Sequence, residues 1–302
     1  MNLSLGPLLY YWSRDDVIAF YDEAKRWPVA RVYMGESVCS RRHLLRLPDW
    51  LELAEQLAAA GKEVVLSSQT LIESESDLKT LRRIVSDSRF RVEANEWGAV
   101  RLLSEAGVAF VAGPTLNVYN PETLDVLAAL GAQRWLPPVE MSHATLAALL
   151  ERAPTGMETE VFAYGKLPLA YSARCFTARH YNLPKDDCQF RCLDHPDGLP
   201  LSTREGAPFL TLNGIQTQSA GVYSLVGELP ALRGLGVASL RLSPQSRHLG
   251  RVVEAFAAAL AGEVPAPATL TRFMPGPPVD GYWHGRAGLE HAGLMHISEK
   301  HV

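Results

Sequence analysis

The four cysteines are the residues of this sequence whose type and spacing most directly suggest chemistry. They are Cys39, Cys175, Cys188 and Cys192. Three of them lie in one polar, proline-rich segment, residues 165–202, whereas Cys39 is remote in sequence. In a reducing compartment, clustered thiols more often bind metal or carry out chemistry than form disulfides. We therefore treat the four cysteines as one candidate site.

Two kinds of metal centre suit four thiolates, namely tetrahedral zinc and an iron–sulfur cluster. Structural zinc sites usually contain two tight pairs such as Cys-x-x-Cys, but here only Cys188 and Cys192 are close in sequence. A cube-shaped iron–sulfur cluster is larger and tolerates scattered ligands. The spacing favours iron–sulfur over zinc and leaves open a third interpretation, unrelated buried thiols, which suits Cys39 best.

The elements that must position these thiols follow a regular pattern, in which short apolar runs alternate with amphipathic stretches. We expect strands at 3–11, 31–35, 63–68, 90–94, 109–113, 134–139, 160–164, 209–212 and 237–242. Helices are expected at 14–25, where Ser13 is placed to cap the first turn, and at 49–60, 74–86, 96–106, 121–131, 142–152 and 249–260. Such alternation predicts parallel strands joined by crossover helices.

A closed barrel and an open doubly wound sheet both fit this alternation. The short, even period and the absence of Gly-x-Gly-x-x-Gly after the first strand favour the barrel. We predict an α/β fold of the TIM-barrel type, with a Cys-rich insertion after a late strand. Residues 1–263 are expected to form one barrel domain that includes the insertion at 165–202, and residues 264–302 a Pro-rich linker and C-terminal tail.

The barrel makes a specific prediction about the cysteines. Loops that follow the strands of a parallel barrel gather on one face, where active sites lie. Cys39 comes four residues after Gly35, the end of the second expected strand, and Cys175 follows the strand expected at 160–164. Both thiols should therefore lie on the same face.

Composition and the remaining motifs exclude several classes of function. The formal net charge of −4 argues against a general nucleic-acid-binding protein. No apolar run approaches the length that spans a bilayer and no secretory leader is visible, so we expect a cytoplasmic protein without a transmembrane segment. The sequence also lacks His-Glu-x-x-His, Gly-x-Ser-x-Gly and a phosphate loop.

Five sequence motifs carry a resemblance to a known family. They are Leu-Gly-Pro at 5–7, YMGESVCS at 33–40, GKLPLAYSARCFTAR at 165–179, PKDDC at 184–188 and LNGIQT at 212–217. With them, the chain resembles the collagenase-like U-family peptidases, and among these the branch that acts in ubiquinone biosynthesis. The resemblance extends from residue 3 to about residue 290, and the long motif around Cys175 is its most specific part.

This resemblance implies a barrel that carries a 4Fe–4S cluster on four cysteines, which fall on Cys39, Cys175, Cys188 and Cys192. It implies a subunit of a hydroxylase that modifies the ring of a ubiquinone precursor without molecular oxygen, as a heterodimer with a homologous subunit, UbiU. An accessory lipid-carrier protein, UbiT, acts in the same pathway. The resemblance does not imply an active peptidase, because no peptidase machinery is present. The alternatives that stay open are a structural-zinc interaction protein and an RNA-base hydroxylase of the same family.

Two further expectations concern the surroundings of the thiols. A cluster whose irons are all held by protein thiolates has no vacant iron for substrate and is best interpreted as an electron carrier. Arg174 and Arg179 flank one ligand and could offset its negative charge, or could equally form weak surface ion pairs. Polar residues that follow later strands, among them Tyr171, Asn213 and Gln216, are candidates to line a substrate pocket.

Overall fold

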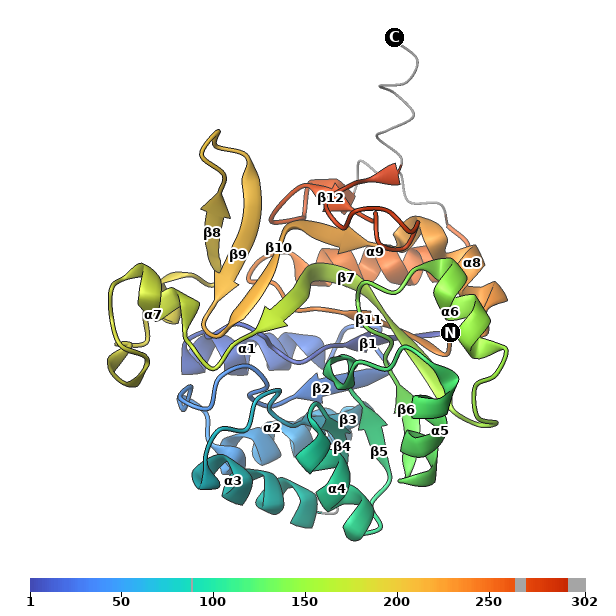
Figure 1. Cartoon of the computed structure of the whole chain (residues 1–302), viewed down its shortest axis with the longest axis horizontal. Helices are drawn as coiled ribbons and strands as arrows, with labels where there is room; N and C mark the ends of the chain where they lie inside the picture. Colours follow the sequence, from blue (N-terminus) through green and yellow to red (C-terminus); the bar gives the residue numbers. More distant parts are fainter. Residues whose placement is uncertain (88, 264–269, 293–302) are drawn as a thin grey trace.

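The computed structural model describes residues 1–87, 89–263 and 270–292, and its central feature is a closed parallel barrel (Figure 1). Eight strands form it within these residues: β1 (Asn2–Leu5), β2 (Arg31–Met34), β3 (Glu63–Ser67), β4 (Arg91–Ala94), β5 (Phe110–Ala112), β6 (Ala132–Trp135), β7 (Glu158–Tyr171) and β11 (Ser239–Leu242). Each pairs in parallel with the next, and β11 closes the barrel by pairing with both β7 and β1. The predicted TIM-barrel-like fold is confirmed.

Helices connect the strands and cover the outside of the barrel. They are α1 (Arg14–Ala24), α2 (Leu47–Ala59), α3 (Glu75–Ser86), α4 (Trp97–Glu105), α5 (Pro121–Ala129), α6 (His143–Leu150), α8 (Leu229–Gly234) and α9 (Leu249–Leu260). The predicted cap at Ser13 is present, because its Oγ accepts a bond from the N–H of Asp16 at 3.2 Å. Ser74, Asn120 and Ser142 begin their helices in the same way. In the described part of the chain, no helix combines the length and apolar character needed to cross a membrane.

The Cys-rich insertion lies where it was predicted, after β7, but β7 itself is longer than expected. Its second half leaves the barrel and pairs antiparallel with β10 (Gln216–Ser224), which pairs with β9 (Pro208–Asn213), and β9 with β8 (Leu199–Ser202). The short helix α7 (Phe176–His180) lies beside this extension (Figure 1). Gly165 stands where β7 leaves the barrel, with φ +131°. A Cβ there would lie 2.5 Å from Cβ of Ser243, so the bend requires glycine.

Two expectations from the sequence differ from the structure at the ends of the barrel domain. The first strand ends at Leu5 instead of Tyr11, because residues 6–12 turn into a buried apolar loop over the barrel mouth. Residues 270–292, expected within a linker and tail, pack on the folded body. There β12 (Pro278–Val279) pairs with β10, and Leu270 and Trp283 are buried. The rest of that segment, residues 264–269 and 293–302, lies outside the described residues.

The interior of the barrel contains a buried network of charged side chains, although branched apolar residues usually fill such barrels. Arg241 donates from Nε to Glu160 at 2.7 Å and from Nη1 to Glu93 at 2.6 Å. Glu160 also accepts bonds from the hydroxyls of Ser4 and Tyr33, both at 2.8 Å. Arg31 supplies a second cation, 3.6 Å from Glu160. Because two guanidinium groups face the two carboxylates, the network can be buried without an uncompensated charge.

Glu160→Gln tests how much the charge of this network contributes to stability. Burial alone would raise the pKa of Glu160, but the guanidinium charge and hydrogen bond of Arg241 outweigh burial, so its pKa lies below the ordinary value. A lowered pKa stabilises the fold above the unfolded-state value of about 4.3, and this stabilisation is lost as the pH falls through the folded-state pKa. At pH 7 the variant should therefore lose about 3 kcal/mol of unfolding free energy.

Urea unfolding of the wild type and the variant at pH 7 and pH 3 checks this prediction. The difference in unfolding free energy between the two proteins should shrink at pH 3, because the wild-type carboxylate is then losing its charge. Glu254→Gln, on the exposed face of α9, is the matched control and should change little at either pH. A difference for Glu160→Gln that is equal at pH 7 and pH 3 would contradict the prediction.

Candidate metal centre

Cys39 lies in the loop between β2 and α2, at the carboxyl end of the barrel. The preceding Glu36 fixes this loop, because its Oε1 accepts the N–H groups of Val38 and Cys39, each at 2.9 Å. The same carboxylate forms an ion pair with Arg42 at 3.8 Å. The loop is therefore held in a conformation in which the Cys39 side chain is buried.

The other three cysteines follow β7. Cys175 is the N-cap residue of α7, and its Sγ accepts the N–H of Ala178 at 3.3 Å. Cys188 follows one short 3₁₀ turn (Lys185–Asp187), and Cys192 lies within another (Arg191–Asp194). The turn between β9 and β10 holds α7 in place, because Gly214 O accepts the N–H of Phe176 at 2.7 Å.

The fold brings these two distant regions together, as the barrel prediction required. Cys39, Cys175 and Cys188 are buried in one apolar cluster. The other buried members of the cluster are Leu9, Val38, Ala178 and Ile215. Cys192 is partly exposed and lies at the edge of this group, next to Gly214. All four thiols are free of disulfides.

Gly214 lies between Arg42 and Cys192, where there is little space for a side chain. Its φ is +63°, and a Cβ built on it would lie 3.0 Å from Nη2 of Arg42 and 3.9 Å from Sγ of Cys192. A side chain at this position would both strain the backbone and enter the space beside the sulfur. The absence of a side chain at Gly214 therefore leaves space between the guanidinium group of Arg42 and the thiol of Cys192.

Arg42, which belongs to no motif that the sequence suggested as a site, is the cation here. The residue is only 5% exposed. Nη1 donates to Leu9 O and Nη2 to Oδ1 of Asn213, both at 2.7 Å, and the Cys192 thiol is one of the groups that raise the pKa of the guanidinium. Among the described residues, Nε of Arg42 has no hydrogen-bond partner.

Arg174 and Arg179, which were expected as possible counter-charges, are both exposed to solvent. Arg42 supplies the positive charge near the thiols instead. Its position three residues after Cys39 was the feature of the sequence that could have indicated it.

The donor set fits a thiolate-bound group. Burial raises the pKa of the Cys39 thiol to about 11 and also raises the pKa of Cys175. Both thiols would therefore be neutral without a bound cation. Yet the N–H of Ala178 already donates to the sulfur of Cys175, and the Arg42 guanidinium lies near Cys192. Such donors stabilise a negatively charged sulfur and tune the potential of iron–sulfur clusters.

No group of three or more Cys, His, Asp or Glu side chains within the described residues has the geometry to hold a single metal ion. The assignment of the four cysteines as ligands thus stays a prediction.

Three residues that the sequence suggested for a substrate pocket, Tyr171, Asn213 and Gln216, are joined by hydrogen bonds. Asn213 donates to Leu9 O at 2.8 Å and to Oε1 of Gln216 at 3.0 Å, and Gln216 donates to the hydroxyl of Tyr171 at 2.6 Å. Asn213 and Gln216 are buried, so this chain of bonds supports the loops that carry the cysteines.

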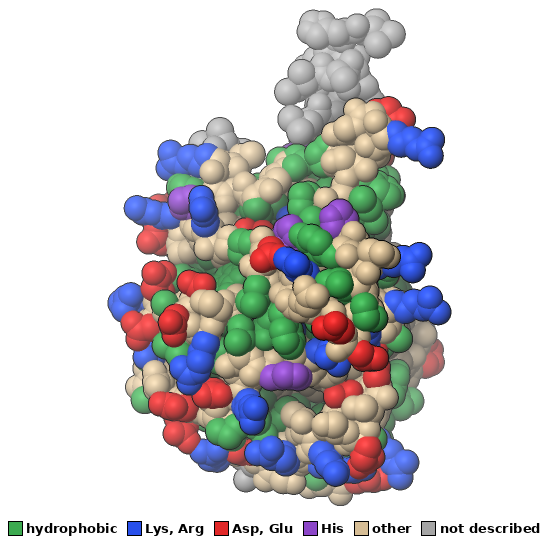
Figure 2. Space-filling view, turned by 90° about the vertical axis from the view of Figure 1, so that its left-hand side faces the viewer, with side chains coloured by type: hydrophobic (Ala, Val, Ile, Leu, Met, Phe, Trp, Pro, Cys, Tyr) green, Lys and Arg blue, Asp and Glu red, His purple; other side chains and the backbone are tan. Residues whose placement is uncertain are grey.

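The side of the molecule that carries α7 and the β8–β9 hairpin has a mixed surface. Figure 2 shows hydrophobic side chains near its centre, with Lys and Arg interspersed among Asp and Glu. The exposed apolar residues Leu169, Leu201 and Phe209 lie on the extension formed by β7, β8 and β9.

Comparison with known proteins gives one sequence family and several distant structures. The structure of the U32 peptidase Mk0906 is 13% identical, with a TM-score of 0.47 over 81% of this chain and 93% of that chain. Dihydropteroate synthase (FolP) from Thermus thermophilus is 14% identical, with a TM-score of 0.44 over 86% of this chain and 92% of its own. The family model for peptidase family U32 matches residues 21–261. The chain therefore belongs to peptidase family U32.

Proposed function

We propose that this chain is the iron–sulfur subunit of an oxygen-independent hydroxylase of ubiquinone biosynthesis, equivalent to the protein known as UbiV. In this proposal it acts on the ring of the quinone precursor as a heterodimer with UbiU, with the lipid carrier UbiT as an accessory protein. The observation that carries the proposal is the convergence of Cys39 with Cys175 and Cys188 in one buried cluster. The motifs around Cys39 and Cys175 supply the resemblance to this branch of the family.

The four cysteines would hold a 4Fe–4S cluster, which supplies single electrons when bound. The residues of the chain have definable parts in this proposal. Leu9, Val38 and Ile215 would exclude water from the sulfurs, because they form the apolar cluster around the thiols. Arg42 would offset the negative charge near Cys192. The loop held by Glu36 would fix the position of Cys39 before the cluster binds.

Cys39→Ser is the most direct test of the ligand set. Purified without air, the wild type should be brown and contain about four iron and four sulfide per chain. The variant should lose most of this iron and show an altered or absent electron paramagnetic resonance signal after reduction. The physical reason is that a serine hydroxyl is a poor substitute for a thiolate on iron.

Leu193→Ser is the matched control, because Leu193 is 40% exposed beside Cys192 and takes no part in the buried cluster. It should retain the iron of the wild type. Circular dichroism separates loss of iron from loss of fold. A colourless wild type with one zinc per chain would support the structural-zinc alternative and sink the proposal. Strong, salt-dependent RNA binding would instead support the RNA-hydroxylase alternative.

Arg42→Gln tests the role of the buried cation. Removal of a positive charge and of a hydrogen-bond donor beside Cys192 disfavours the more negative, reduced cluster. The midpoint potential should therefore become more negative in a redox titration followed by electron paramagnetic resonance. Arg174→Gln, an exposed neighbour of Cys175, should leave it nearly unchanged. Equal potentials for Arg42→Gln and wild type, at equal iron content, would contradict this role.

The heterodimer can be tested on the projecting extension. Phe209 is 54% exposed on β9, with Leu201 exposed on the neighbouring strand β8. Exposed apolar groups gathered in this way commonly mark protein interfaces. The chain should elute with UbiU as a heterodimer in size-exclusion chromatography, and Phe209→Ser should weaken the complex. Leu289→Ser, which is also exposed but lies elsewhere, should not. Separate elution of the two wild-type chains would contradict the pairing.

A further inference from the structure

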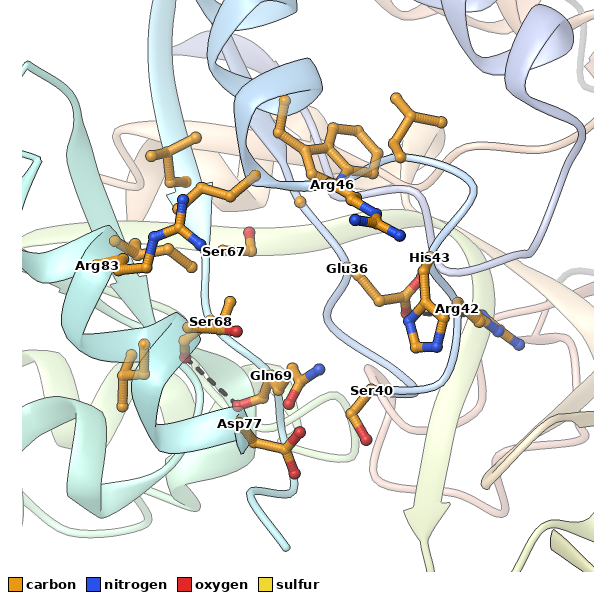
Figure 3. A pocket seen from close by; sticks show the side chains of 18 of the residues that line it. Glu36, Ser40, Arg42, His43, Arg46, Ser67, Ser68, Gln69, Asp77 and Arg83 are labelled. Carbon is orange, nitrogen blue, oxygen red and sulfur yellow. Dashed lines mark hydrogen bonds and ion pairs between the residues drawn. The ribbon is translucent and has the colours of Figure 1, made fainter. Parts of the chain in front are cut away.

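A pocket with a volume of about 410 Å³ opens at the carboxyl ends of β2 and β3, between α2 and α3 (Figure 3). One wall is the loop that carries Cys39, because Glu36, Ser40 and His43 line the pocket. Glu36 also accepts the N–H of Cys39 at 2.9 Å. The pocket and the Cys39 thiol are therefore built on the same short loop. The volume lies within the range of small-molecule sites.

The pocket has an apolar wall and a polar wall. The apolar side chains include Leu45, Trp50, Leu66, Ile72, Leu81 and Ile84. Hydroxyl and amide groups come from the carboxyl end of β3 and the residues that follow it, among them Ser67, Ser68 and Gln69. A wall of aliphatic and indole surface favours a flat apolar body such as a ring.

Three arginines line this pocket, and one of them, Arg42, is paired with Glu36. Figure 3 shows the guanidinium groups of Arg46, which precedes α2, and Arg83, on α3, directed toward its interior. In the part of the chain that the structure describes, the Arg83 side chain has neither a hydrogen bond nor an ion pair. The neighbouring Arg82, by contrast, binds Oε1 of Glu75 at 2.5 Å. Arg83 is exposed to solvent and lines the pocket without an ion pair to Asp77 or Glu36.

Of the two acids that line the same pocket, Glu36 is paired with a cation, and Asp77 forms no ion pair among the described residues. Glu36 accepts two backbone N–H groups and pairs with Arg42. Asp77 accepts the N–H of Glu73 at 3.1 Å. Three arginines against two acids leave the lining with a surplus of positive charge beside an apolar surface.

We infer that this pocket binds a small aromatic carboxylate, with its ring against the wall around Trp50 and its acid group on Arg83 and Arg46. Arginine is suited to this task because its planar donors match the two oxygens of a carboxylate. The inference deepens the proposed function and rests on it for one point, namely that the ring belongs to an aromatic substrate of the hydroxylase. Binding itself requires only the pocket.

Isothermal titration of the anaerobically purified chain with 4-hydroxybenzoate tests the inference. The wild type should show saturable binding, and Arg83→Gln should bind roughly tenfold more weakly, the effect of losing one charge-assisted hydrogen bond. Arg82→Gln, one residue away on α3 and paired outside the pocket, is the matched control and should bind as the wild type does. 4-Hydroxybenzyl alcohol, which has the same ring without the carboxylate, should bind at least about tenfold more weakly.

Three results would overturn the inference: no saturable binding to the wild type, equal affinity for wild type and Arg83→Gln, or displacement of the aromatic acid by an equal concentration of inorganic phosphate. Iron analysis of the same samples keeps this inference apart from the proposed function. Binding by a chain that holds no iron leaves the pocket assignment standing while the cluster fails. A chain with full iron content that does not bind 4-hydroxybenzoate would leave the cluster assignment standing and refute the pocket assignment.

Discussion

The cysteine site depends on the contacts that the buried guanidinium group of Arg42 makes with the surrounding loops. It joins three segments that are far apart in sequence, since it bonds Leu9 O after β1 and the Asn213 side chain at the end of β9, and pairs with Glu36 after β2. Cys39 lies three residues before it, and Cys192 is within its reach. The loop of Cys39 is thus held against the insertion that carries the other thiols. A buried charge tolerates this position only because so many acceptors surround it.

Much of the fold could be predicted from the sequence because the signals are local. Apolar runs of strand length alternate with capped helices such as the one that Ser13 begins, and this period led to the barrel and to the shared face of Cys39 and Cys175. The long β7 and the packing of β12 on β10 could not be predicted, since both depend on antiparallel or distant pairing. Periodicity gives the type of an element but not its partner.

The cysteines of the site could be predicted from the sequence, but the charged residues around them could not. Cysteine is rare enough that four residues define a set, whereas 29 Lys and Arg residues give no reason to choose Arg42 or Arg83. Arg174 and Arg179 flank Cys175 in sequence, but both are exposed to solvent. Contacts across the carboxyl end of a barrel depend on how its loops fold over the strands, and short-range sequence patterns carry little of that information.

The loop formed by residues 35–43 therefore contributes both to the buried cluster that contains the thiols and to the lining of the partly apolar pocket. The most direct measurement of the central claim is a crystal structure of the anaerobically purified protein, with anomalous scattering recorded at the iron edge. The account predicts a compact group of four irons, each bonded to the sulfur of one of Cys39, Cys175, Cys188 and Cys192. A single metal ion, or a cluster from which Cys39 stands apart, would contradict it.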